Sequence, residues 1–437
     1  MWYNKDMETI VALATPAGNS GVAVIRMSGD LVKDIAQNII NEELEFKPRH
    51  MYLKEITCKD IKDTALVVYF SAPNSYTGED VVEIQSHGGY FLAQKIIEQC
   101  VEYGAKLATP GEFSKRAFIN GKMSIDQAEG VMDIINAESE MQAKQASNLL
   151  IGSLKDKITI FQNTITDILA ELEAKIDYPE YEFTDDESNS LQEKLKNLIN
   201  DLTMMISNSK NGLKIKNGVC IAIIGAPNVG KSSILNALTN SNKAIVTNVA
   251  GTTRDVVEAE YEYNGIIFRL FDTAGIHESN DIVEQIGINR AKQTLNDADL
   301  VLLISDKNTP NNMKTDKPFL KIYNKIDMFG ENLDKDYINI SAQTGENIDL
   351  LKQKIFDYTI GERLNENGFY LTNIRHIECI KSALEHIISA SALFDNMTMD
   401  VISAELKSAW ITLGEISGTT TNETIIDRIF SKFCLGK

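Results

Sequence analysis

The 437-residue sequence has few cysteines, no long apolar run and a deficit of basic residues. Its five cysteines are scattered, and none stands at C-x-x-C spacing from another. An odd, unclustered set fits neither a disulfide framework nor a zinc site, and it favours a reducing compartment. The longest apolar runs, such as 219–224 and 300–304, have the length of a strand. They fall far short of the roughly 20 residues that a membrane-spanning helix needs.

The first six residues (MWYNKD) lack the basic stretch and the apolar core of a secretory signal peptide. Apolar residues make up 43% of the chain and charged residues 24%, which is typical of a folded globular protein and not of a disordered or fibrous one. Together with the cysteine usage, these features predict a soluble cytoplasmic protein.

Basic residues are outnumbered, with 43 Lys and Arg against 62 Asp and Glu and a net charge of −19. This balance excludes a generally basic protein that coats nucleic-acid phosphates, so any nucleic-acid contact is expected at a local site. Residues 121–212 alone carry 8 basic and 17 acidic groups, a net of −9. We therefore expect nucleic acid to contact other parts of the chain, or to be shared with a partner protein.

The chain is long enough for about three domains of roughly 150 residues each. Short apolar runs punctuated by Gly and Pro predict an α+β domain over residues 1–120. Residues 121–212 repeat apolar side chains every three to four positions, which predicts amphipathic helices interrupted at Gly130 and Gly152. A further helix is predicted from about Leu191 to Asn208, ending near Gly212.

Residues 213–363 alternate strand-like and helix-like segments, which predicts an α/β domain with a parallel sheet. Within it, Asn264-Gly265 predicts a hairpin, because a two-residue turn needs the positive φ angles that this pair adopts readily. Helical periodicity resumes over residues 364–437. We therefore predict a discontinuous helical domain, 121–212 plus 364–437, with the α/β domain inserted into it.

The strongest chemical motif is GAPNVGKS at residues 225–232, with an apolar strand before it and a helical segment after it. In this context the glycines let backbone N–H groups curl around phosphate oxygens at a helix N-terminus. Lys231 would reach the β- and γ-phosphates, and the Ser232 hydroxyl would bind Mg²⁺. Alone, the pattern would also fit a Gly-rich turn between a strand and a helix.

Three further motifs follow in the order that a GTPase requires. DTAG at 272–275 would hold Mg²⁺ through water and sense the γ-phosphate. NKID at 324–327 places Asp327 to accept hydrogen bonds from guanine N1–H and N2–H₂, which adenine does not offer, so a carboxylate buried there selects GTP over ATP. Ser341 and Ala342 would complete the base pocket. The predicted GTP-binding residues are Asn228, Val229, Gly230, Lys231, Ser232, Ser233, Thr247, Asn248, Val249, Ala250, Gly251, Thr252, Thr253, Asp272, Thr273, Ala274, Gly275, Asn324, Lys325, Asp327, Ser341 and Ala342.

The residue after DTAG is Ile276, where Ras-like GTPases keep the Gln that positions the attacking water. Another group must therefore orient the nucleophile. The segment NVAGTTRD at 248–255 has the place and composition of a Mg²⁺-ordering switch loop. Its Arg254 is either an arginine finger or the partner of a neighbouring acidic side chain, and the second interpretation is the simpler one.

Segments along almost the whole chain resemble the MnmE (TrmE) tRNA-modification GTPases. The resemblance rests on the following motifs: Ala-Thr-Pro at 14–16, VIRMSG at 24–29, SYTGED at 75–80, EIQSHGG at 83–89, ATPGEFSKRAF at 108–118, the phosphate loop, AGTTRD at 250–255 and FCLGK at 433–437. It implies an α+β, folate-binding-like N-terminal domain and a discontinuous α-helical domain that carries an inserted Ras-like P-loop GTPase domain.

The resemblance also implies a homodimer formed through the N-terminal domain, with G domains that meet face to face when active. Asn228 matches a K⁺ ligand, and Thr247, Val249 and Thr252 match the residues that complete the K⁺ cage. Thr253 matches the second Mg²⁺ ligand beside Ser232. Glu284 matches the catalytic glutamate that orients water, and it acts beside Lys231.

In the N-terminal domain, the resemblance implies binding of a tetrahydrofolate one-carbon carrier, as the 5-formyl or methylene derivative. The matching positions are Arg26, Glu83, Lys122 and Lys437. Cys434 matches a catalytic cysteine in a C-x-G-K tail. A prenylation box has the same register, but Gly436 and a terminal lysine fit it poorly.

The implied function is GTP hydrolysis coupled to a modification of tRNA. With an FAD-dependent, MnmG-like partner in a heterotetramer, the protein would form a carboxymethylaminomethyl or aminomethyl group at C5 of wobble uridine U34. The alternative is a ribosome-assembly or regulatory GTPase whose flanking domains bind RNA. A folate-dependent aminomethyltransferase with an inactive G domain is disfavoured, because all the G motifs are intact. The polar connection at 307–318 is expected to be a shortened surface segment that leaves the chemistry alone.

Overall fold

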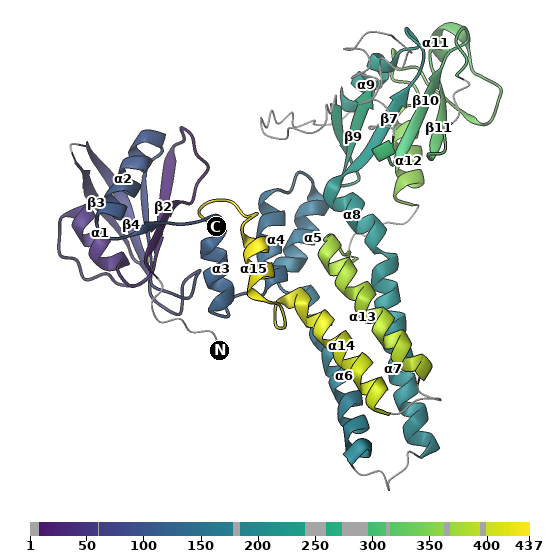
Figure 1. Cartoon of the computed structure of the whole chain (residues 1–437). Helices are drawn as coiled ribbons and strands as arrows, with labels where there is room; N and C mark the ends of the chain where they lie inside the picture. The colour runs from purple at the N-terminus through teal and green to yellow at the C-terminus, as the bar shows by residue number, and fades with distance from the viewer. Residues whose placement is uncertain are drawn as a thin grey trace, which may run out of the picture. The chain divides into compact units, whose positions relative to one another are not determined.

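The computed structural model describes residues 8–59, 61–177, 184–240, 259–272, 296–311, 315–361, 368–393 and 399–437. The chain forms two compact units, each with its own six-stranded sheet (Figure 1). The first unit comprises Met1–Met132, Leu149–Glu182 and Leu393–Lys437, and the second comprises Asp133–Asn148 and Phe183–Ala392. The protein is thus multi-domain, with both helical and α/β parts. The three predicted domain boundaries differ from these divisions and stay a prediction.

The first unit is built on a sheet that is antiparallel except at one edge. Its strand order is β3 (Met51–Cys58), β4 (Ile61–Phe70), β5 (Val81–His87), β2 (Val22–Ser28), β1 (Ile10–Leu13) and β6 (Lys106–Leu107), with β6 parallel to β1. Helices α1 (Val32–Ile40) and α2 (Tyr90–Glu102) bury apolar side chains in a common core with this sheet. The mixed α and β content predicted for residues 1–120 is confirmed.

Helix α3 (Glu112–Ile119) is fastened to this sheet by a buried arginine. The Arg116 side chain is 4% exposed, and its guanidinium lies 3.0 Å from a Glu79 carboxylate oxygen and 2.8 Å from one of Glu112. Such a pair is favourable only because both carboxylates compensate the desolvated cation. Helix α15 (Glu423–Phe430) packs against α3, and a Cβ on Gly111 would lie 2.2 Å from the Phe430 carbonyl oxygen. The C-terminal segment is therefore held tightly beside the N-terminal sheet.

The helices predicted after residue 121 are present as α4 (Ile125–Ile135), α5 (Glu140–Leu150) and α6 (Ser153–Asp177). In the first unit α6 packs along α14 (Met399–Ser417), and the Gln162 amide donates to the Trp410 carbonyl at 3.0 Å. Gly152, with φ of +90°, does separate α5 from α6. The predicted interruption at Gly130 is wrong, because this residue is buried inside α4. Tertiary packing there overrides a helix penalty of about 1 kcal/mol.

In the second unit, α7 (Asp185–Ser207) begins before the predicted Leu191 because of a capping box. The Thr184 hydroxyl accepts from the Glu187 amide, and the Glu187 carboxylate accepts from the Thr184 amide. The predicted end of this helix at Asn208 is confirmed, since Asn208 is its C-cap, but the stop expected near Gly212 is wrong. Helix α8 (Ser209–Asn217) runs through Gly212, where a Cβ would lie 2.1 Å from the Leu371 carbonyl oxygen. That glycine therefore permits a close approach and does not stop the helix.

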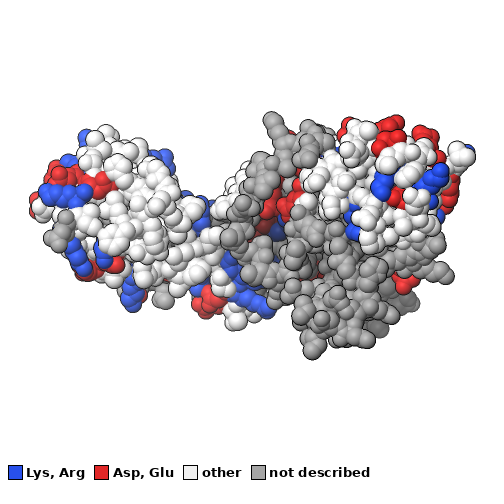
Figure 2. Space-filling model, turned by 90° about the horizontal axis from the view of Figure 1, so that it is seen from above, with Lys and Arg blue, Asp and Glu red and all other residues white. Residues whose placement is uncertain are grey.

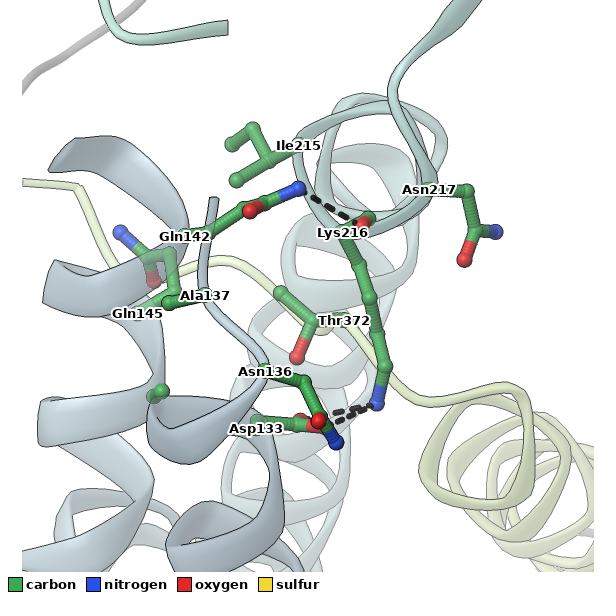
Figure 3. Close-up of a pocket in the computed structure, with 10 residues that line it drawn as sticks. Asp133, Asn136, Ala137, Gln142, Gln145, Ile215, Lys216, Asn217 and Thr372 are labelled. Atoms are coloured by element: carbon green, nitrogen blue, oxygen red, sulfur yellow. Dashed lines mark hydrogen bonds and ion pairs between the residues drawn. The ribbon is translucent and has the colours of Figure 1, made fainter. Parts of the chain in front are cut away.

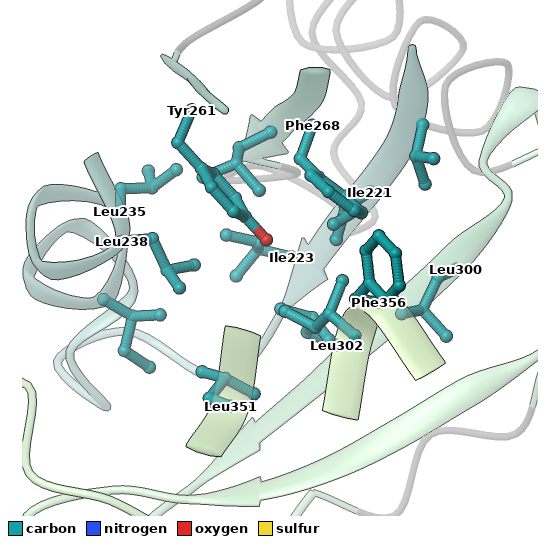
Figure 4. Packing of buried hydrophobic residues seen from close by; sticks show 14 of the residues in the cluster. Ile221, Ile223, Leu235, Leu238, Tyr261, Phe268, Leu300, Leu302, Leu351 and Phe356 are labelled. Atoms are coloured by element: carbon teal, nitrogen blue, oxygen red, sulfur yellow. The ribbon is translucent and has the colours of Figure 1, made fainter. Parts of the chain in front are cut away.

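The second sheet has the order β12 (Tyr337–Asn339), β11 (Phe319–Tyr323), β10 (Leu300–Ser305), β7 (Val219–Ile224), β9 (Ile266–Asp272) and β8 (Ala259–Tyr263). All pairs are parallel except the β8–β9 hairpin, in which Asn264 and Gly265 have positive φ angles as predicted. Helices α9 (Lys231–Asn240) and α12 (Ile348–Thr359) contribute to its core. The Tyr261 and Phe268 rings stack there with centroids 5.1 Å apart (Figure 4). The predicted parallel α/β domain is confirmed.

On the face shown in Figure 2, Lys and Arg side chains stand in small groups close to Asp and Glu, so neither charge covers a broad continuous area there. Within the described ranges, no helix combines the length and apolar content needed to cross a membrane.

Candidate nucleotide-binding site

The GAPNVGKS loop lies at the carboxyl end of β7, between its neighbours β10 and β9, and leads directly into α9. This is the edge at which open parallel sheets bind their ligands. Val229 is fully buried in the core and anchors the loop. Asn228 and Gly230 have φ angles of +66° and +96°, so the chain turns sharply on either side of that anchor.

Asn324, the first residue of the NKID motif, cross-links the phosphate loop to the segment at Ser341 and Ala342 that is predicted to bind the base. It is 2% exposed, its Nδ2 donates to the Val229 carbonyl at 2.9 Å, and its Oδ1 accepts from the Ala342 amide at 3.1 Å. A Cβ on Gly230 would lie only 2.3 Å from Asn324 Nδ2. The loop therefore requires glycine at 230, both for its backbone angle and for this contact.

Asp327 and Ser341 lie together on the base side of the site. The Ser341 hydroxyl donates to Asp327 Oδ1 at 2.5 Å and accepts from the Thr344 amide at 3.2 Å. Ser341 is fully buried, so its hydroxyl holds the Asp327 carboxylate in one orientation from the protein interior. The sequence-based expectation of a buried Asp327 needs correction, because its side chain is exposed. Binding of a base would itself have to remove this carboxylate from water.

The phosphate-side residues lie at the start of α9. The Lys231 ammonium donates to the Gly225 carbonyl at 3.0 Å and to the Ala226 carbonyl at 3.3 Å, so it lies across the beginning of the loop. Ser232 and Ser233 are exposed in the first turn of the helix, where backbone N–H groups attract anions. A phosphate and a hard cation would both find suitable groups here.

Part of the predicted site lies outside the described residues. These positions are Thr247, Asn248, Val249, Ala250, Gly251, Thr252, Thr253, Arg254, Thr273, Ala274, Gly275 and Glu284. Asp272 is the last residue of β9 and pairs with Ile223 of β7, which puts its backbone at the same edge of the sheet as the loop. In the described part of the chain, no group of three His, Cys, Asp or Glu side chains is placed to hold a metal ion.

In the first unit, Arg26 and Glu83 face each other across β2 and β5. The Arg26 Nε and one of its terminal nitrogens each lie 2.8 Å from the same Glu83 oxygen. The Arg26 guanidinium also lies 5.3 Å from the centroid of the Tyr76 ring and 5.9 Å from that of Phe113. Sequence reasoning missed both rings. Tyr76 stands in the SYTGED motif, but a motif does not reveal which side chain a distant ring covers.

The C-terminal tail brings Lys437 to this pair. Burial and the nearby Arg26 lower the pKa of the Lys437 amine, while Glu83 and Cys434 oppose that shift. Gly436 has a φ of +88°, and a Cβ there would lie 2.2 Å from the Leu13 carbonyl oxygen, so the tail is closely docked. Cys434 is exposed next to this cluster.

The structure does not bring Lys122 to the Arg26–Glu83 pair. Its ammonium donates instead to the Pro73 carbonyl at 2.9 Å. The stem of its side chain lies over Gly78, where an added Cβ would come within 3.2 Å of Lys122 Cγ. Of the four positions that the sequence analysis expects to bind folate, Lys122 is thus the one that the described contacts leave apart.

A polar cavity of about 180 Å³ lies in the second unit, at the amino end of β7 (Figure 3). Its wall includes an ion pair of Lys216 with Asp133 at 2.7 Å, and the Gln142 amide donates to the Lys216 carbonyl at 3.0 Å. Because the phosphate loop follows the opposite end of β7, this cavity is separate from the nucleotide site. Lys216 of α8 thus binds both Asp133 of α4 and Gln142 of α5, which is typical of a structural joint between these helices.

The sheet order, the glycine loop and the Asn-Lys-x-Asp turn that is linked to it define the class of the second unit. It is a P-loop domain of the guanine-nucleotide-binding type.

Comparison with known proteins identifies the family. The profile of the "GTP-binding protein TrmE N-terminus" matches residues 9–122, and that of the "MnmE helical domain" matches residues 125–434. The chain is 37% identical to the tRNA modification GTPase MnmE of Staphylococcus aureus, covering 99% of this chain and all of that protein. It is 36% identical to that of Desulforamulus reducens, covering 98% and 99%, and 37% identical to that of Streptococcus pneumoniae, covering 99% of each. The chain belongs to the MnmE family of tRNA modification GTPases.

Proposed function

We propose that this chain is a GTP hydrolase that works with an FAD-dependent, MnmG-like partner. Together they form a carboxymethylaminomethyl or aminomethyl group at C5 of wobble uridine U34 in tRNA. The observation that carries the GTPase part is the cross-link made by Asn324, which joins a phosphate loop to a guanine-selecting turn. Family membership over nearly the whole chain supports the tRNA part.

In the GTP site, Asp327 accepts hydrogen bonds from guanine N1–H and N2–H₂. The Lys231 side chain moves, so that its ammonium leaves the loop carbonyls and binds the phosphates. Ser232 and Thr253 would hold Mg²⁺, which would supply positive charge to neutralise the phosphates. The exposed Ser232 hydroxyl, one residue into α9, suits that role. Glu284 orients the attacking water in place of the glutamine that Ile276 replaces.

A monovalent cation site is proposed at Asn228, with Thr247, Val249 and Thr252 completing the cage. The Asn228 carbonyl oxygen already accepts from the Lys325 ammonium at 2.6 Å, while its side chain is exposed and can offer its own carbonyl oxygen to K⁺. Bound K⁺ would supply positive charge next to the transferring phosphoryl group.

We therefore expect GTP hydrolysis to be at least roughly tenfold faster in KCl than in NaCl at equal ionic strength, because the proposed site takes K⁺, whose positive charge stabilises the transition state. Asn228→Ala is expected to remove this difference while keeping the slow basal rate. Phosphate release in the two salts measures both. Equal rates of the unaltered chain in K⁺ and Na⁺ would show that the cation cage is wrong.

Homodimerisation is proposed through the N-terminal domain, with the G domains meeting face to face in the active state. Met51 and Leu53 are 49% and 68% exposed on β3, the edge strand of the first sheet. Apolar side chains on an open edge favour coverage by another chain. A sedimenting mass of twice 48.6 kDa is the check.

A tetrahydrofolate one-carbon carrier is proposed at Arg26, Glu83 and Lys437, with Lys122 at the margin. Burial and, after it, the nearby Arg26 lower the pKa of the Lys437 amine, so its charged form would gain from an anionic ligand, and the glutamate carboxylates of a folate supply one. Glu83 suits the N–H edge of a pterin. The exposed Cys434 stands beside this site, where it would take part in the modification chemistry.

The decisive experiment for the proposed function is nucleoside mass spectrometry of tRNA from cells that carry the chain as the sole copy of its gene. Lys231→Ala and Cys434→Ser are each expected to abolish the U34 modification, and Arg26→Met is expected to lower both the modification and folate retention by the full-length protein. Lys62→Ala, which removes an exposed surface charge, is the control and leaves the modification intact. Normal modification in a deletion strain would favour the ribosome-assembly alternative.

A further inference from the structure

A buried carboxylate that the GTPase motifs do not include lies beneath the nucleotide site. Asp306 follows directly after β10, the strand between β7 and β11, so it lies at the same edge of the sheet as the phosphate loop and the NKID turn. It is 5% exposed. Acidic side chains are rarely buried so deeply unless a partner compensates the charge.

One side of the Asp306 carboxylate is fixed by the turn that it begins. Its Oδ1 accepts from the Asn308 amide at 3.0 Å, from the Thr309 amide at 3.0 Å and from the Thr309 hydroxyl at 2.5 Å. Burial opposes ionisation, but these bonds and the Lys325 ammonium outweigh it and lower the pKa of this carboxyl below its ordinary value. The group is therefore an anion held in one position.

The other side of the carboxylate faces Lys325. Asp306 Oδ2 lies 2.7 Å from the Lys325 Nζ, and the same ammonium donates to the Asn228 carbonyl of the phosphate loop at 2.6 Å. Lys325 has a φ of +69° and stands between Asn324 and Asp327 in the NKID turn. One cation thus joins three segments: the turn after β10, the base-binding turn and the phosphate loop.

The connection after Asp306 supports the same edge of the sheet. The Asn311 amide donates to the Ile224 carbonyl at 3.1 Å and to the Ile304 carbonyl at 3.3 Å, at the ends of β7 and β10. A Cβ on the adjacent Gly225 would lie 2.9 Å from the same Ile304 oxygen. These contacts do not fit the expectation of a surface connection that leaves the nucleotide site alone.

We propose that Asp306 is a positioning residue for guanine-nucleotide binding, acting through Lys325 on the Asn228 end of the phosphate loop. This inference rests on the proposed GTP site. A lysine side chain is long and flexible, and a fixed anion at its tip removes most of its rotamers before a nucleotide arrives. Loss of that anion would loosen the link between the loop and the base-binding turn. It would weaken GTP and GDP binding alike and leave the hydrolytic step unchanged.

The experiment is a double-mutant cycle on GDP affinity with Asp306→Ala, Lys325→Met and the double variant, measured with a fluorescent GDP. Each single variant is expected to bind GDP about tenfold to a hundredfold more weakly, the ratio that corresponds to one charge-assisted hydrogen bond. The double variant should be no weaker than Lys325→Met, because Asp306 acts through that lysine. At saturating GTP, kcat of Asp306→Ala is expected to stay within about twofold of the unaltered chain.

Asp299→Ala is the matched control. Asp299 stands just before the other end of β10 and accepts from the Cys220 amide at 2.9 Å, so it is a structural carboxylate of the same strand with no link to the loop. Its loss should lower thermal stability without changing GDP affinity. If Asp306→Ala does not fold, Asp306→Asn keeps the shape of the side chain and takes its place.

The outcomes separate this inference from the proposed function. If the unaltered chain binds no guanine nucleotide, the proposed GTPase function fails and the inference fails with it. If that chain binds GDP but the folded Asp306 variant binds it equally well, only the inference is overturned. Additive losses in the double variant would also overturn it, because they would mean that Asp306 and Lys325 act independently.

Discussion

Asp327→Asn is expected to lower kcat/KM for GTP by about a thousandfold or more and to make xanthosine triphosphate the better substrate. In the proposed site the carboxylate would accept two hydrogen bonds from guanine, and a site built around such bonds discriminates by factors of this size when one partner is changed. The asparagine amide would instead place a donor against the guanine N1–H and N2–H₂ groups. Xanthine carries a carbonyl oxygen where guanine carries its amino group, so the amide donor finds an acceptor there.

Ser341→Ala is the companion to this substitution. It removes the hydroxyl that holds Asp327 Oδ1 at 2.5 Å but keeps the carboxylate. We expect about a tenfold loss for GTP, with no gain for xanthosine triphosphate, since one neutral-to-charged hydrogen bond is lost. Steady-state hydrolysis of both nucleotides measures the ratio. A folded Asp327→Asn variant with an unchanged ratio would remove Asp327 from the base site.

Gly230→Ala is the second substitution for which we expect a large effect, a loss of nucleotide affinity of at least about a hundredfold. The new Cβ would lie 2.3 Å from Asn324 Nδ2, and the φ of +96° is unfavourable for any residue with a side chain. Asn324 would have to move, which breaks its bonds to the Val229 carbonyl and the Ala342 amide, each worth about 1 kcal/mol. The phosphate loop and the base-binding segment would then lose their cross-link.

Gly330→Ala separates backbone strain from this collision. Gly330 has a φ of +74°, but nothing lies within 4 Å of the position of its Cβ. Its replacement should cost stability of about 1 kcal/mol and leave nucleotide affinity nearly unchanged. Titration with a fluorescent GDP and thermal unfolding distinguish the two effects. Equal affinity losses in both variants would mean that strain alone, and not the contact with Asn324, explains the need for glycine at 230.

The helical segments show how far local sequence rules reach in this chain. Thr184 and Glu187 have the spacing of a capping box, so the sequence contains the signal for the start of α7. Gly130, Gly152 and Gly212 cannot be told apart by such rules. The first is buried within a helix, the second ends one, and the third meets the backbone at Leu371. What a glycine does depends on the neighbour that tertiary packing brings to it.

Tertiary packing also decides which residues meet in the candidate site of the N-terminal domain. The family resemblance proposes Arg26, Glu83, Lys122 and Lys437 as a set, and the structure draws three of them together. The Tyr76 and Phe113 rings beside Arg26 come from segments 50 and 87 residues further along the chain. Cross-strand pairing and docking of the tail create that arrangement, and periodicity in one segment carries no information about it.

The sequence alone determined the alternation of strands and helices in the α/β segment, the Asn-Gly hairpin and the G motifs, because each depends on residues close together in the chain. Only the tertiary structure decided that Lys325 would bridge Asn228 and Asp306, which lie 97 and 19 residues before it. Parallel strands bring their carboxyl ends to one edge regardless of their separation in sequence. Which side chains then meet at that edge is settled by packing geometry, and no local pattern records it.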